Sequence, residues 1–406
     1  MNKNINVVMM GLGYIGLPTA ALIAGKGIKV LGVDVKKEAV DIINQGKIHI
    51  IEPDLEGLVN YAVTNGFLKA DVKPVKADVY LIAVPTPFKG EFVPDLAYVE
   101  SATRLITPFL EKGNLVILES TSPVGTTEKV ASWIFSIRPE LKGQIHLAYC
   151  PERVLPGRIL HELENNDRAI GGLDKSSAEK AAAFYSLFVK GDLHQTNART
   201  AEMCKLVENS YRDTNIAFAN ELSMICDRVG INVWELIELA NKHPRVKILT
   251  PGPGVGGHCI AVDPWFIVHD FPNESKIIRT AREVNNHKPE WVLEKVSAAA
   301  KDFLAKNNRQ PVIACMGLAF KPDIDDLRES PSLEITEKLI KHGYKVLAVE
   351  PNLENSRTIE LTDSADAINK ADILLFLVAH KFFKEITLGQ IASKVVIDVC
   401  GLFKMA

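Results

Sequence analysis

The chain has 406 residues, more than one hydrophobic core usually organises, so we expect two or three domains. Its 47 basic and 50 acidic residues give a formal net charge of -3, which provides no bulk attraction for nucleic acid or for an anionic membrane. Its six cysteines are widely scattered, which argues against a disulfide framework or a structural metal site and favours a reducing, cytoplasmic compartment.

Apolar runs alternate with helical patterns in the N-terminal part of the chain. Residues 5–10 form a continuous apolar run that is typical of a buried parallel strand, and a helix is expected at 15–26. Further strands are expected at 30–33, 79–84 and 115–118. This alternation of strands and helices predicts a doubly wound parallel sheet.

The apolar run at the N-terminus superficially resembles the hydrophobic segment of a secretory signal peptide. It is interrupted by three glycines and by Pro18, and it leads into a second apolar strand that ends in Asp34. A dinucleotide-binding fold explains this continuation and a cleaved leader does not. We also expect no membrane span, since no run reaches the roughly 18 uninterrupted apolar residues that one requires.

From about residue 200 the pattern changes to long helices. Residues 202–229 contain neither glycine nor proline, and a helix of about 28 residues spans roughly 40 Å. Helical patterns continue through 234–241 and 275–305, with a loop rich in glycine and proline between them. A helix as long as the first of these usually joins domains or forms the seam of a dimer.

The last hundred residues return to the alternation of strand and helix. Strands are expected at 312–316, 346–349, 373–378 and 395–399. Motifs of the first domain recur here, with Val349-Glu350 in the place of Val33-Asp34. We therefore expect an α/β fold with two Rossmann-like doubly wound domains joined by a central helical domain. The expected boundaries are 1–198, 199–305 and 306–406.

A glycine-rich turn follows the first expected strand. The stretch Gly11-Leu12-Gly13-Tyr14-Ile15-Gly16 matches the pattern G-x-G-x-x-G, in which the glycines turn the chain, admit a pyrophosphate and pack helix on strand. Asp34 ends the second strand, 18 residues after Gly16, where its carboxylate can accept hydrogen bonds from ribose hydroxyls. A 2′-phosphate would be repelled by that carboxylate, so the pattern predicts NAD rather than NADP.

The second α/β region carries only part of this pattern. Gly317-Leu318-Ala319-Phe320-Lys321 lacks the complete set of glycines, so it should not hold a second dinucleotide in the same way. Two interpretations stay open. Lys321 can neutralise the phosphates of a nucleotide diphosphate, or the stretch is an ordinary turn with a solvated lysine.

Three polar residues near the start of the long helix share one face. Lys205, Asn209 and Arg212 are spaced i, i+4 and i+7. A lysine and an asparagine one turn apart suit a hydroxyl that becomes an alkoxide, because the ammonium stabilises the charge and the amide orients the oxygen. An ordinary solvent-exposed helix face explains the same spacing, and the sequence leaves both interpretations open.

Cys259 lies in the loop rich in glycine and proline, Pro251-Gly252-Pro253-Gly254-Val255-Gly256-Gly257-His258-Cys259. A lone cysteine is usually a buried core residue, but glycines allow a substrate to approach this thiol, and Asp263 follows four residues later. A nucleophile in a dinucleotide enzyme indicates that a carbonyl product is trapped and oxidised again, from alcohol to acid. We assign His258 no catalytic role and expect no metal ion.

Several blocks together resemble a known family over essentially the full length of the chain. They are GLGYIGLP, VPTP, ESTSPVGTTEK, CPERVLPG, RTAEMCKLVENSYRD, GVGGHCIAVDP and GLAFKPDIDDLRESP. The chain resembles the nucleotide-sugar 6-dehydrogenases, the family of UDP-glucose dehydrogenase. The resemblance implies a four-electron oxidation of the C6 hydroxyl of a UDP-sugar to a carboxylate, with two NAD consumed per sugar, feeding a surface polysaccharide.

The resemblance also implies roles for five residues in the reaction. Cys259 is expected to form a thiohemiacetal with the C6 aldehyde and then a thioester. Lys205 would stabilise the oxyanion and shuttle the proton, and Asn209 would help to bind the C6 oxygen. Asp263 and Glu152 would orient or activate the water that hydrolyses the thioester.

The binding residues follow from the same resemblance. Around NAD they are Gly11, Gly13, Tyr14, Ile15, Gly16, Asp34, Thr86, Thr121 and Arg328. Around the UDP-sugar, besides Lys205 and Asn209, they are Arg153, Val154, Arg212, His243, Arg245, Gly254, Phe320 and Lys321. In this family an arginine of the partner subunit often reaches the sugar. Arg245 is the candidate, which predicts a homodimer.

Two departures from glucose-specific relatives bear on the substrate. Pro156 replaces a second acid after the Pro-Glu pair, and His258 replaces a small residue before the nucleophile. Both are consistent with an N-acetylated sugar, and the resemblance favours UDP-N-acetylmannosamine. The alternatives are UDP-N-acetylglucosamine or UDP-glucose as substrate, a two-electron dehydrogenase of the β-hydroxyacid type, and a catalytically silent nucleotide-sugar sensor.

Overall fold

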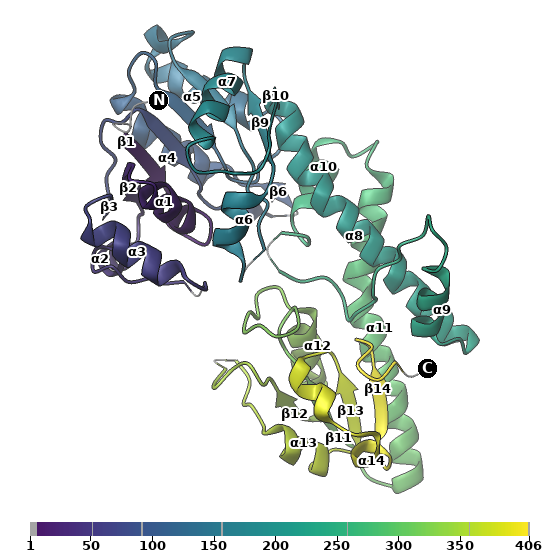
Figure 1. The fold of residues 1–406 in the computed structure, drawn as a ribbon. Helices are drawn as coiled ribbons and strands as arrows, with labels where there is room; N and C mark the ends of the chain where they lie inside the picture. The colour runs from purple at the N-terminus through teal and green to yellow at the C-terminus, as the bar shows by residue number, and fades with distance from the viewer. Residues whose placement is uncertain are drawn as a thin grey trace. The chain divides into compact units, whose positions relative to one another are not determined.

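The computed structural model describes residues 6–50, 52–90, 92–155, 157–257, 259–356 and 358–404 (Figure 1). The chain divides into two compact units, Met1–Glu208 and Asn209–Ala406. No helix among the described residues is long and apolar enough to cross a membrane.

The first unit contains an eight-stranded sheet in the order β10-β9-β8-β7-β4-β1-β2-β3. The strands are β1 (Asn6–Met10), β2 (Lys29–Val33), β3 (Leu68–Asp71), β4 (Val79–Ile82), β7 (Leu115–Leu118), β8 (His146–Tyr149), β9 (Arg168–Gly172) and β10 (Leu193–Asn197). Neighbouring strands pair in parallel except β8 and β9, which pair antiparallel. A separate hairpin joins β5 (Phe88–Lys89) to β6 (Val93–Pro94).

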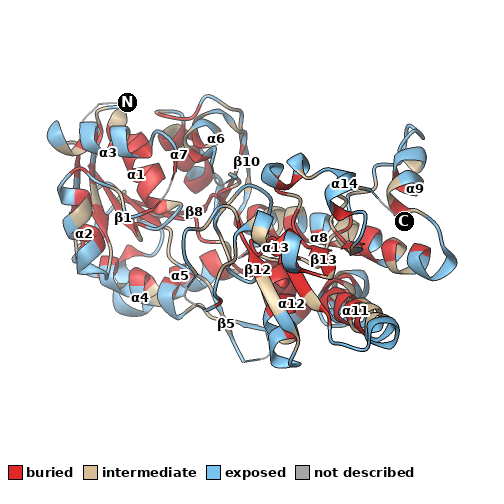
Figure 2. Cartoon of the chain, turned by 90° about the horizontal axis from the view of Figure 1, so that it is seen from below, coloured by how far each residue is buried: buried red, intermediate tan, exposed pale blue. Residues whose placement is uncertain are grey.

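Helices cover both faces of this sheet because alternate residues of its buried strands point to opposite sides. The helices are α1 (Gly16–Gly25), α2 (Lys37–Asn44), α3 (Leu55–Thr64), α4 (Ala97–Ile106), α5 (Thr126–Ile137), α6 (Ile159–Asn165) and α7 (Lys175–Tyr185). Val7 and Met9 of β1 belong to the core that includes α1, α3, α6 and α7. Val8 and Met10 belong to the core that includes α4 and α5. Buried residues accordingly concentrate in the strands and on the helix faces that meet them (Figure 2).

The strand order of the first unit fixes where a ligand can bind. β1 lies between β2 and β4, so the chain winds in one direction from β1 to β3 and in the other from β4 onward. In open α/β sheets, ligands bind outside the carboxyl ends of the strands at such a switch point. The turns that follow β1, β4 and β7 are therefore the expected place for a cofactor.

Helix α8 (Ala198–Val229) begins in the first unit and continues into the second. It starts four residues before the helix expected from the sequence and ends where expected. The helices that follow it are α9 (Val233–Ala240), α10 (Asp263–Asp270) and α11 (Lys276–Asn307).

The second unit ends in a four-stranded parallel sheet with the order β12-β11-β13-β14. The strands are β11 (Val312–Met316), β12 (Lys345–Val349), β13 (Ile373–Phe376) and β14 (Val395–Asp398), and the helices are α12 (Pro331–Lys341), α13 (Ser364–Lys370) and α14 (Leu388–Ile391). α11 and α12 pack on one face of this sheet, and α13 and α14 on the other. β11 again lies at a switch point, between β12 and β13.

The expected fold class is confirmed, with two Rossmann-type sheets and a helical segment that contains a long helix. The boundaries expected at 198/199 and 305/306 stay predictions. The sequence did not reveal the three strands after β7, and β10 shows why. It reads Leu-His-Gln-Thr-Asn at the edge of the sheet, so it has no apolar run to mark it.

Candidate active site

The glycine turn after β1 has room for a ligand at one of its three glycines. Gly11 has φ 94°, and a Cβ there would lie 2.5 Å from the carbonyl oxygen of Ala83. A Cβ on Gly16 would lie 1.9 Å from the carbonyl oxygen of Gly11. Gly13 is exposed, and apart from its own neighbours in the chain no protein atom lies within 4 Å of the position of its missing Cβ. The fold therefore requires Gly11 and Gly16, whereas the open space at Gly13 fits the approach of a pyrophosphate.

Asp34 stands at the edge of this turn and braces it. Its carboxylate accepts hydrogen bonds from the backbone amides of Leu12 and Lys36, both at 2.9 Å. Asp34 is only half-buried, so its carboxylate can also meet a ribose. The first turn of α1 contains no acidic residue, which leaves its N-terminal amides suited to a phosphate group. The residues present thus fit a dinucleotide.

Other residues predicted for the cofactor are distributed over both units. The hydroxyl of Thr86 donates to the carbonyl oxygen of Thr121 at 2.6 Å, which ties the loop after β4 to the loop after β7. Tyr14 is 41% exposed beside the glycine turn. Arg328 belongs to the second unit, where it pairs with Asp326 at 2.5 Å, and its role at the cofactor stays a prediction.

Glu152, which follows β8, is held in a buried ion pair. Its Oε2 lies 2.7 Å from Nη1 of Arg168, and its Oε1 accepts from the backbone amide of Arg153 at 2.6 Å. Both Glu152 and Arg168 are almost fully buried. The other terminal nitrogen of Arg168 donates to the carbonyl oxygen of Leu163. The carboxylate of Glu152 is therefore fixed in position.

A second buried carboxyl lies behind this pair. Glu119, directly after β7, accepts a hydrogen bond of 2.5 Å from the hydroxyl of Tyr185 on α7. The guanidinium of Arg168 lies 5.6 Å from the centre of the Tyr185 ring. Burial raises the pKa of Glu119 to about 7. Sequence reasoning singled out none of Arg168, Glu119 and Tyr185. Glu119 begins the block ESTSPVGTTEK, but its partner Tyr185 lies 66 residues away, so the sequence does not show that the two meet.

The start of α8 is fastened by Glu202, another residue that sequence reasoning did not single out. Its buried carboxylate accepts from the amide of Gly125 at 2.6 Å and from the amide and hydroxyl of Thr127 at 2.8 and 2.6 Å. These groups form the N-terminus of α5, where a carboxylate is favoured. Lys205 is half-buried one turn further along α8, so Glu202 fixes the part of the helix that carries it.

The polar face of α8 is not a simple solvent-exposed face. Arg212 is exposed, but Asn209 is only 7% exposed. The side-chain amide of Asn209 donates to Oδ2 of Asp263 at 2.5 Å. The structure thus brings together two of the predicted catalytic residues, and Asp263 is itself buried as the first residue of α10.

The Cys259 loop, residues 251–262, is attached to α8 at both ends. At its start, Oδ1 of Asn220 accepts from the amide of Gly252 at 2.9 Å. At its end, Asp263 receives the hydrogen bond from Asn209. Cys259 is exposed, and its carbonyl oxygen accepts from the amide of Asp263 at 2.9 Å, which sets the thiol just before α10.

The middle of the Cys259 loop packs against the segment that follows β11. A Cβ on Gly256 would lie 2.4 Å from the carbonyl oxygen of Glu329 and 2.8 Å from Cβ of Phe320. Gly257 has φ 81°, and its amide donates to the carbonyl oxygen of Arg328 at 3.3 Å. These glycines therefore allow a close approach that any side chain would prevent.

The remaining residues predicted for the nucleotide sugar vary in environment. Lys321, His243 and Arg245 are exposed. Arg153 pairs with Glu208 on α8 at 2.6 Å, and Val154 packs against the core of the first unit. Pro156 and His258, the two departures that suggested an N-acetylated sugar, lie outside the described residues.

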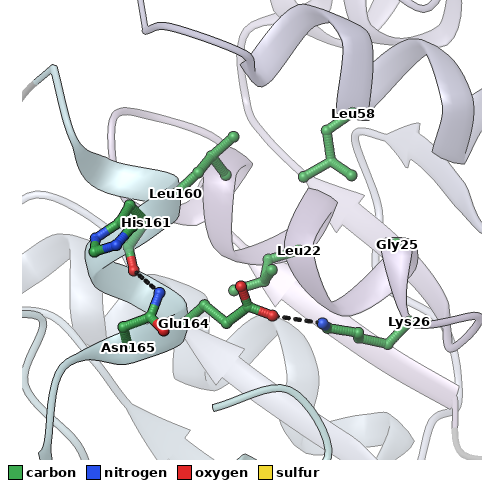
Figure 3. A pocket seen from close by; sticks show the side chains of 8 residues that line it. All are labelled: Leu22, Gly25, Lys26, Leu58, Leu160, His161, Glu164 and Asn165. Carbon is green, nitrogen blue, oxygen red and sulfur yellow. Dashed lines mark hydrogen bonds and ion pairs between the residues drawn. The ribbon is translucent and has the colours of Figure 1, made fainter. Parts of the chain in front are cut away.

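A surface depression of about 300 Å³ lies elsewhere on the first unit (Figure 3). It is lined by Leu22, Gly25, Lys26, Leu58, Leu160, His161, Glu164 and Asn165. Lys26 pairs with Glu164 at 2.6 Å on one side of it. The depression adjoins the C-terminal end of α1, whereas the glycine turn precedes the N-terminal end, so it is not the cofactor site.

A glycine turn and an acid at the switch point of a doubly wound sheet are the features of a dinucleotide-binding protein. Three models of the UDP-glucose/GDP-mannose dehydrogenase family match the chain: the NAD binding domain at residues 5–189, the central domain at 199–287 and the UDP binding domain at 314–405. The chain belongs to this family. The predicted cofactor, NAD, is thereby confirmed, and the UDP binding domain at residues 314–405 supports a UDP-sugar as substrate, whereas the role of the turn at Lys321 stays a prediction.

Individual relatives cover nearly the whole chain. It is 54% identical to the UDP-N-acetyl-D-mannosamine dehydrogenase of Escherichia coli K12, over 98% of this chain and 99% of that protein. It is 53% identical to the NDP-N-acetyl-D-galactosaminuronic acid dehydrogenase of Ralstonia nicotianae, over 99% and 96%. The solved structure of a UDP-D-ManNAc dehydrogenase from Pyrococcus horikoshii superposes with a TM-score of 0.89 at 38% identity, covering 99% of this chain and 97% of that chain.

Proposed function

We propose that this chain is an NAD-dependent UDP-N-acetyl-D-mannosamine 6-dehydrogenase, which oxidises the C6 hydroxyl to a carboxylate in two steps. The observation that carries the proposal is the exposed thiol of Cys259 in a loop that is fastened to α8 at both ends. The names of the Escherichia coli and Ralstonia relatives both contain an N-acetylated amino sugar, which supports that class of substrate.

The thiol explains how one enzyme can take an alcohol to an acid. NAD, when bound, supplies the electron acceptor for each oxidation. Between the two oxidations the Cys259 sulfur adds to the C6 aldehyde, forming a C–S bond and a thiohemiacetal. Oxidation of this adduct leaves a thioester, and water then breaks the C–S bond to release the carboxylate and the thiol.

The other residues predicted for catalysis have complementary tasks in this scheme. The neutral amine of Lys205 accepts the proton of the C6 hydroxyl, and the ammonium that results stabilises negative charge on the C6 oxygen. Asp263 accepts a hydrogen bond from the side-chain amide of Asn209, which fixes the plane of that amide. The amide of Asn209 helps to bind the C6 oxygen. Glu152, fixed by Arg168, is suited to orient the hydrolytic water together with Asp263.

We assign the NAD-binding residues mainly to the N-terminal domain and the residues that bind the UDP moiety to the C-terminal domain. The glycine turn, with Asp34 and the Thr86–Thr121 contact, holds NAD. Phe320 and the exposed Lys321 serve the UDP moiety, where the lysine neutralises phosphate charge. The roles of the other predicted residues stay as the sequence resemblance implies: Arg153, Val154, Arg212, His243 and Gly254.

A homodimer is part of the proposal. α8 exposes Tyr211, Phe218 and Ile225 at seven-residue intervals, with 70%, 52% and 52% of each residue accessible. Large apolar residues repeating every seven positions are typical of a seam between helices of two copies. In such a dimer the exposed Arg245 would reach the sugar bound to the partner subunit. We expect this enzyme to act in the cytoplasm and to feed the synthesis of a surface polysaccharide.

The deciding experiment measures the NADH formed per nucleotide sugar consumed. UDP-N-acetylmannosamine, its glucosamine epimer and UDP-glucose are compared on the parent, on Cys259→Ser and on the control Cys204→Ser. A ratio of two with the mannosamine sugar, lost in Cys259→Ser and kept in Cys204→Ser, is expected. A ratio of one that Cys259→Ser leaves unchanged would contradict the covalent step and favour a β-hydroxyacid-type dehydrogenase.

The remaining outcomes separate substrate from activity. Turnover of the glucosamine sugar or UDP-glucose in preference to the mannosamine sugar would change the substrate and keep the mechanism. Tight binding of a nucleotide sugar without turnover of any of the three would indicate a sensor.

A further inference from the structure

The acid that follows β12, Glu350, has other contacts than the acid that follows β2, Asp34. Glu350 is only 4% exposed, whereas Asp34 is half-buried. The carboxylate of Glu350 accepts from the amides of Leu318 and Ala319 at 2.8 and 2.9 Å and from the amide of Asn352 at 3.0 Å. It therefore secures the turn after β11 and has no exposed surface with which to meet a ribose.

His380, shortly after β13, is the side chain that completes this arrangement. Its ring is fully buried, and its Nδ1 lies 2.9 Å from the backbone amide of Asp323. Because a backbone amide can only donate, Nδ1 accepts, and the ring proton lies on Nε2. Nε2 then donates to Glu350 across 3.1 Å. Burial by itself raises the pKa of Glu350, but the hydrogen bonds from His380 and Leu318 outweigh it and hold that pKa below its ordinary value.

Glu350 and His380 together hold both ends of one short turn, residues 318–323. Glu350 binds its first two amides, and His380 binds the amide of Asp323 at its end. Asp323 has φ 61°, and its carboxylate accepts from the amide of Lys381 at 2.8 Å, which ties the same end of the turn to the segment after β13. Phe320 and Lys321, the residues proposed to serve the UDP moiety, lie between the two ends.

The same turn supports the Cys259 loop. Gly256 and Gly257 lie against Phe320. A Cβ on Gly256 would be 2.8 Å, and one on Gly257 3.0 Å, from the nearest atom of that side chain. Cys259 follows two residues after Gly257. A displacement of the turn must therefore be transmitted to the loop that carries the thiol, because close-packed groups cannot move independently.

We propose that Glu350 and His380 are positioning residues that couple occupancy of the UDP site to the placement of the Cys259 thiol. The inference rests on the proposed function in one respect, namely that the turn at Phe320 and Lys321 meets UDP. The hydrogen bond from His380 to Glu350 makes the turn rigid, so a displacement that UDP imposes at Phe320 and Lys321 passes to the Cys259 loop packed against it.

Two substitutions of one residue form a matched test. In His380→Gln, the side-chain amide can place an N–H near the position of Nε2 and so keep a donor for Glu350. In His380→Asn, the side-chain carbonyl can accept from the amide of Asp323 near the position of Nδ1. The shorter side chain has no donor that reaches Glu350, which keeps only its other hydrogen bonds. Leu339→Ala, in the apolar core between α12 and the sheet, controls for lower stability in the same domain.

The readout is the rate at which iodoacetamide alkylates Cys259, followed by mass spectrometry with and without saturating UDP in the full-length protein. We expect UDP to change this rate in the parent, in His380→Gln and in Leu339→Ala. In His380→Asn the effect of UDP should shrink about fivefold or more, which is the lower end of ordinary coupling between sites. kcat should fall in the same variant, with KM for NAD unchanged.

The outcomes distinguish this inference from the proposed function. Absence of UDP binding to the parent, measured by calorimetry, would overturn both. UDP binding without any effect on Cys259 alkylation, or with an equal effect in parent and His380→Asn, would overturn the coupling alone. Equal losses in His380→Asn and Leu339→Ala would reduce the role of His380 to general stability and also overturn it.

Discussion

Arg168 and Glu152 form an ion pair of 2.7 Å in which the side chains are only 3% and 7% exposed. Such a pair is expensive to desolvate, and it is fixed here by further hydrogen bonds to the carbonyl of Leu163 and from the amide of Arg153. The pair thus fixes the position of a carboxylate within the protein interior.

Arg168→Met should destabilise the protein by about 3–5 kcal/mol, because it leaves the Glu152 carboxylate buried without its partner. The double variant Arg168→Met/Glu152→Gln should recover a large part of that loss, since no charge is then buried. Denaturant unfolding of both variants measures the difference. Arg158→Met serves as the control, because Arg158 is exposed and its carboxylate partner is 4.0 Å away. A double variant no more stable than the single one would contradict the argument.

Glu119→Gln should change how stability depends on pH. The pKa of Glu119 is raised to about 7 from an ordinary value of 4.5, so the folded state binds more protons between these values. Its contribution to stability is fully present below pH 4.5 and is lost as pH rises through 7. Glutamine still accepts from Tyr185 and carries no charge. The variant should therefore gain stability relative to the parent from pH 5 to 8.

The gain should level off above pH 7 at roughly 3 kcal/mol, since each pH unit between the two pKa values corresponds to about 1.4 kcal/mol. Urea denaturation at pH 5, 6, 7 and 8 measures it. A difference between the two proteins that stays constant over this range would show that Glu119 is ionised throughout.

The residues that could be predicted from the sequence and those that could not differ in how far along the chain their partners lie. The turn at Gly11 and the loop at Cys259 could be found in the sequence because each gathers several glycines within a few residues. Glu202 stands three residues before Lys205, yet its partners at Gly125 and Thr127 are more than seventy residues away. A buried carboxylate of this kind is indistinguishable in the sequence from a solvated one.

The C-terminal domain shows that a repeated motif also does not reveal distant contacts. The echo of Val33-Asp34 by Val349-Glu350 correctly indicated a second Rossmann-like sheet. It did not indicate that the carboxylate of Glu350 is fully occupied by hydrogen bonds from Leu318, Ala319 and His380, because His380 lies 30 residues away. Repetition of a motif predicts the fold, whereas the use of its acid depends on what the fold places beside it.

Gly13→Ala should separate cofactor binding from folding. Apart from its neighbours in the chain, the new methyl group meets no protein atom within 4 Å, so the melting temperature should match that of the parent. NADH affinity should fall about tenfold or more, because the methyl group occupies the path of the pyrophosphate. Gly16→Ala is the contrasting variant, since its Cβ would lie 1.9 Å from the carbonyl oxygen of Gly11 and should disrupt the turn itself. Fluorescence titration and thermal melting report the two quantities. Unchanged NADH affinity in a folded Gly13→Ala would remove the glycine turn from the cofactor site.

Phe218→Glu should convert the proposed dimer into monomers. Placing a carboxylate in the middle of the exposed apolar stripe of α8 opposes burial against a second copy. Light scattering measures the mass, and activity should fall with it if Arg245 acts on the partner's sugar. Tyr98→Glu on α4, where Tyr98 is 53% exposed, should leave the mass unchanged. A fully active monomer would refute the role of Arg245 across subunits.

Lys288→Met should stabilise the protein most at neutral and lower pH. The Lys288 ammonium is 1% exposed, bonds Ser223 on α8 at 2.5 Å and lies 3.6 Å from the centre of the Trp291 ring. Burial lowers its pKa from 10.5 to about 7, with Lys295 contributing in the same direction and Asp227 opposing. The folded state therefore binds fewer protons between pH 7 and 10.5, and parent stability rises across that window.

Methionine fills a similar volume without a charge, so the stability advantage of Lys288→Met should be greatest below pH 7 and shrink toward pH 10. Unfolding at pH 6, 8 and 10 tests this against Lys295→Met, whose lysine is partly exposed. An advantage that grows with pH would show that Lys288 is not the group that titrates.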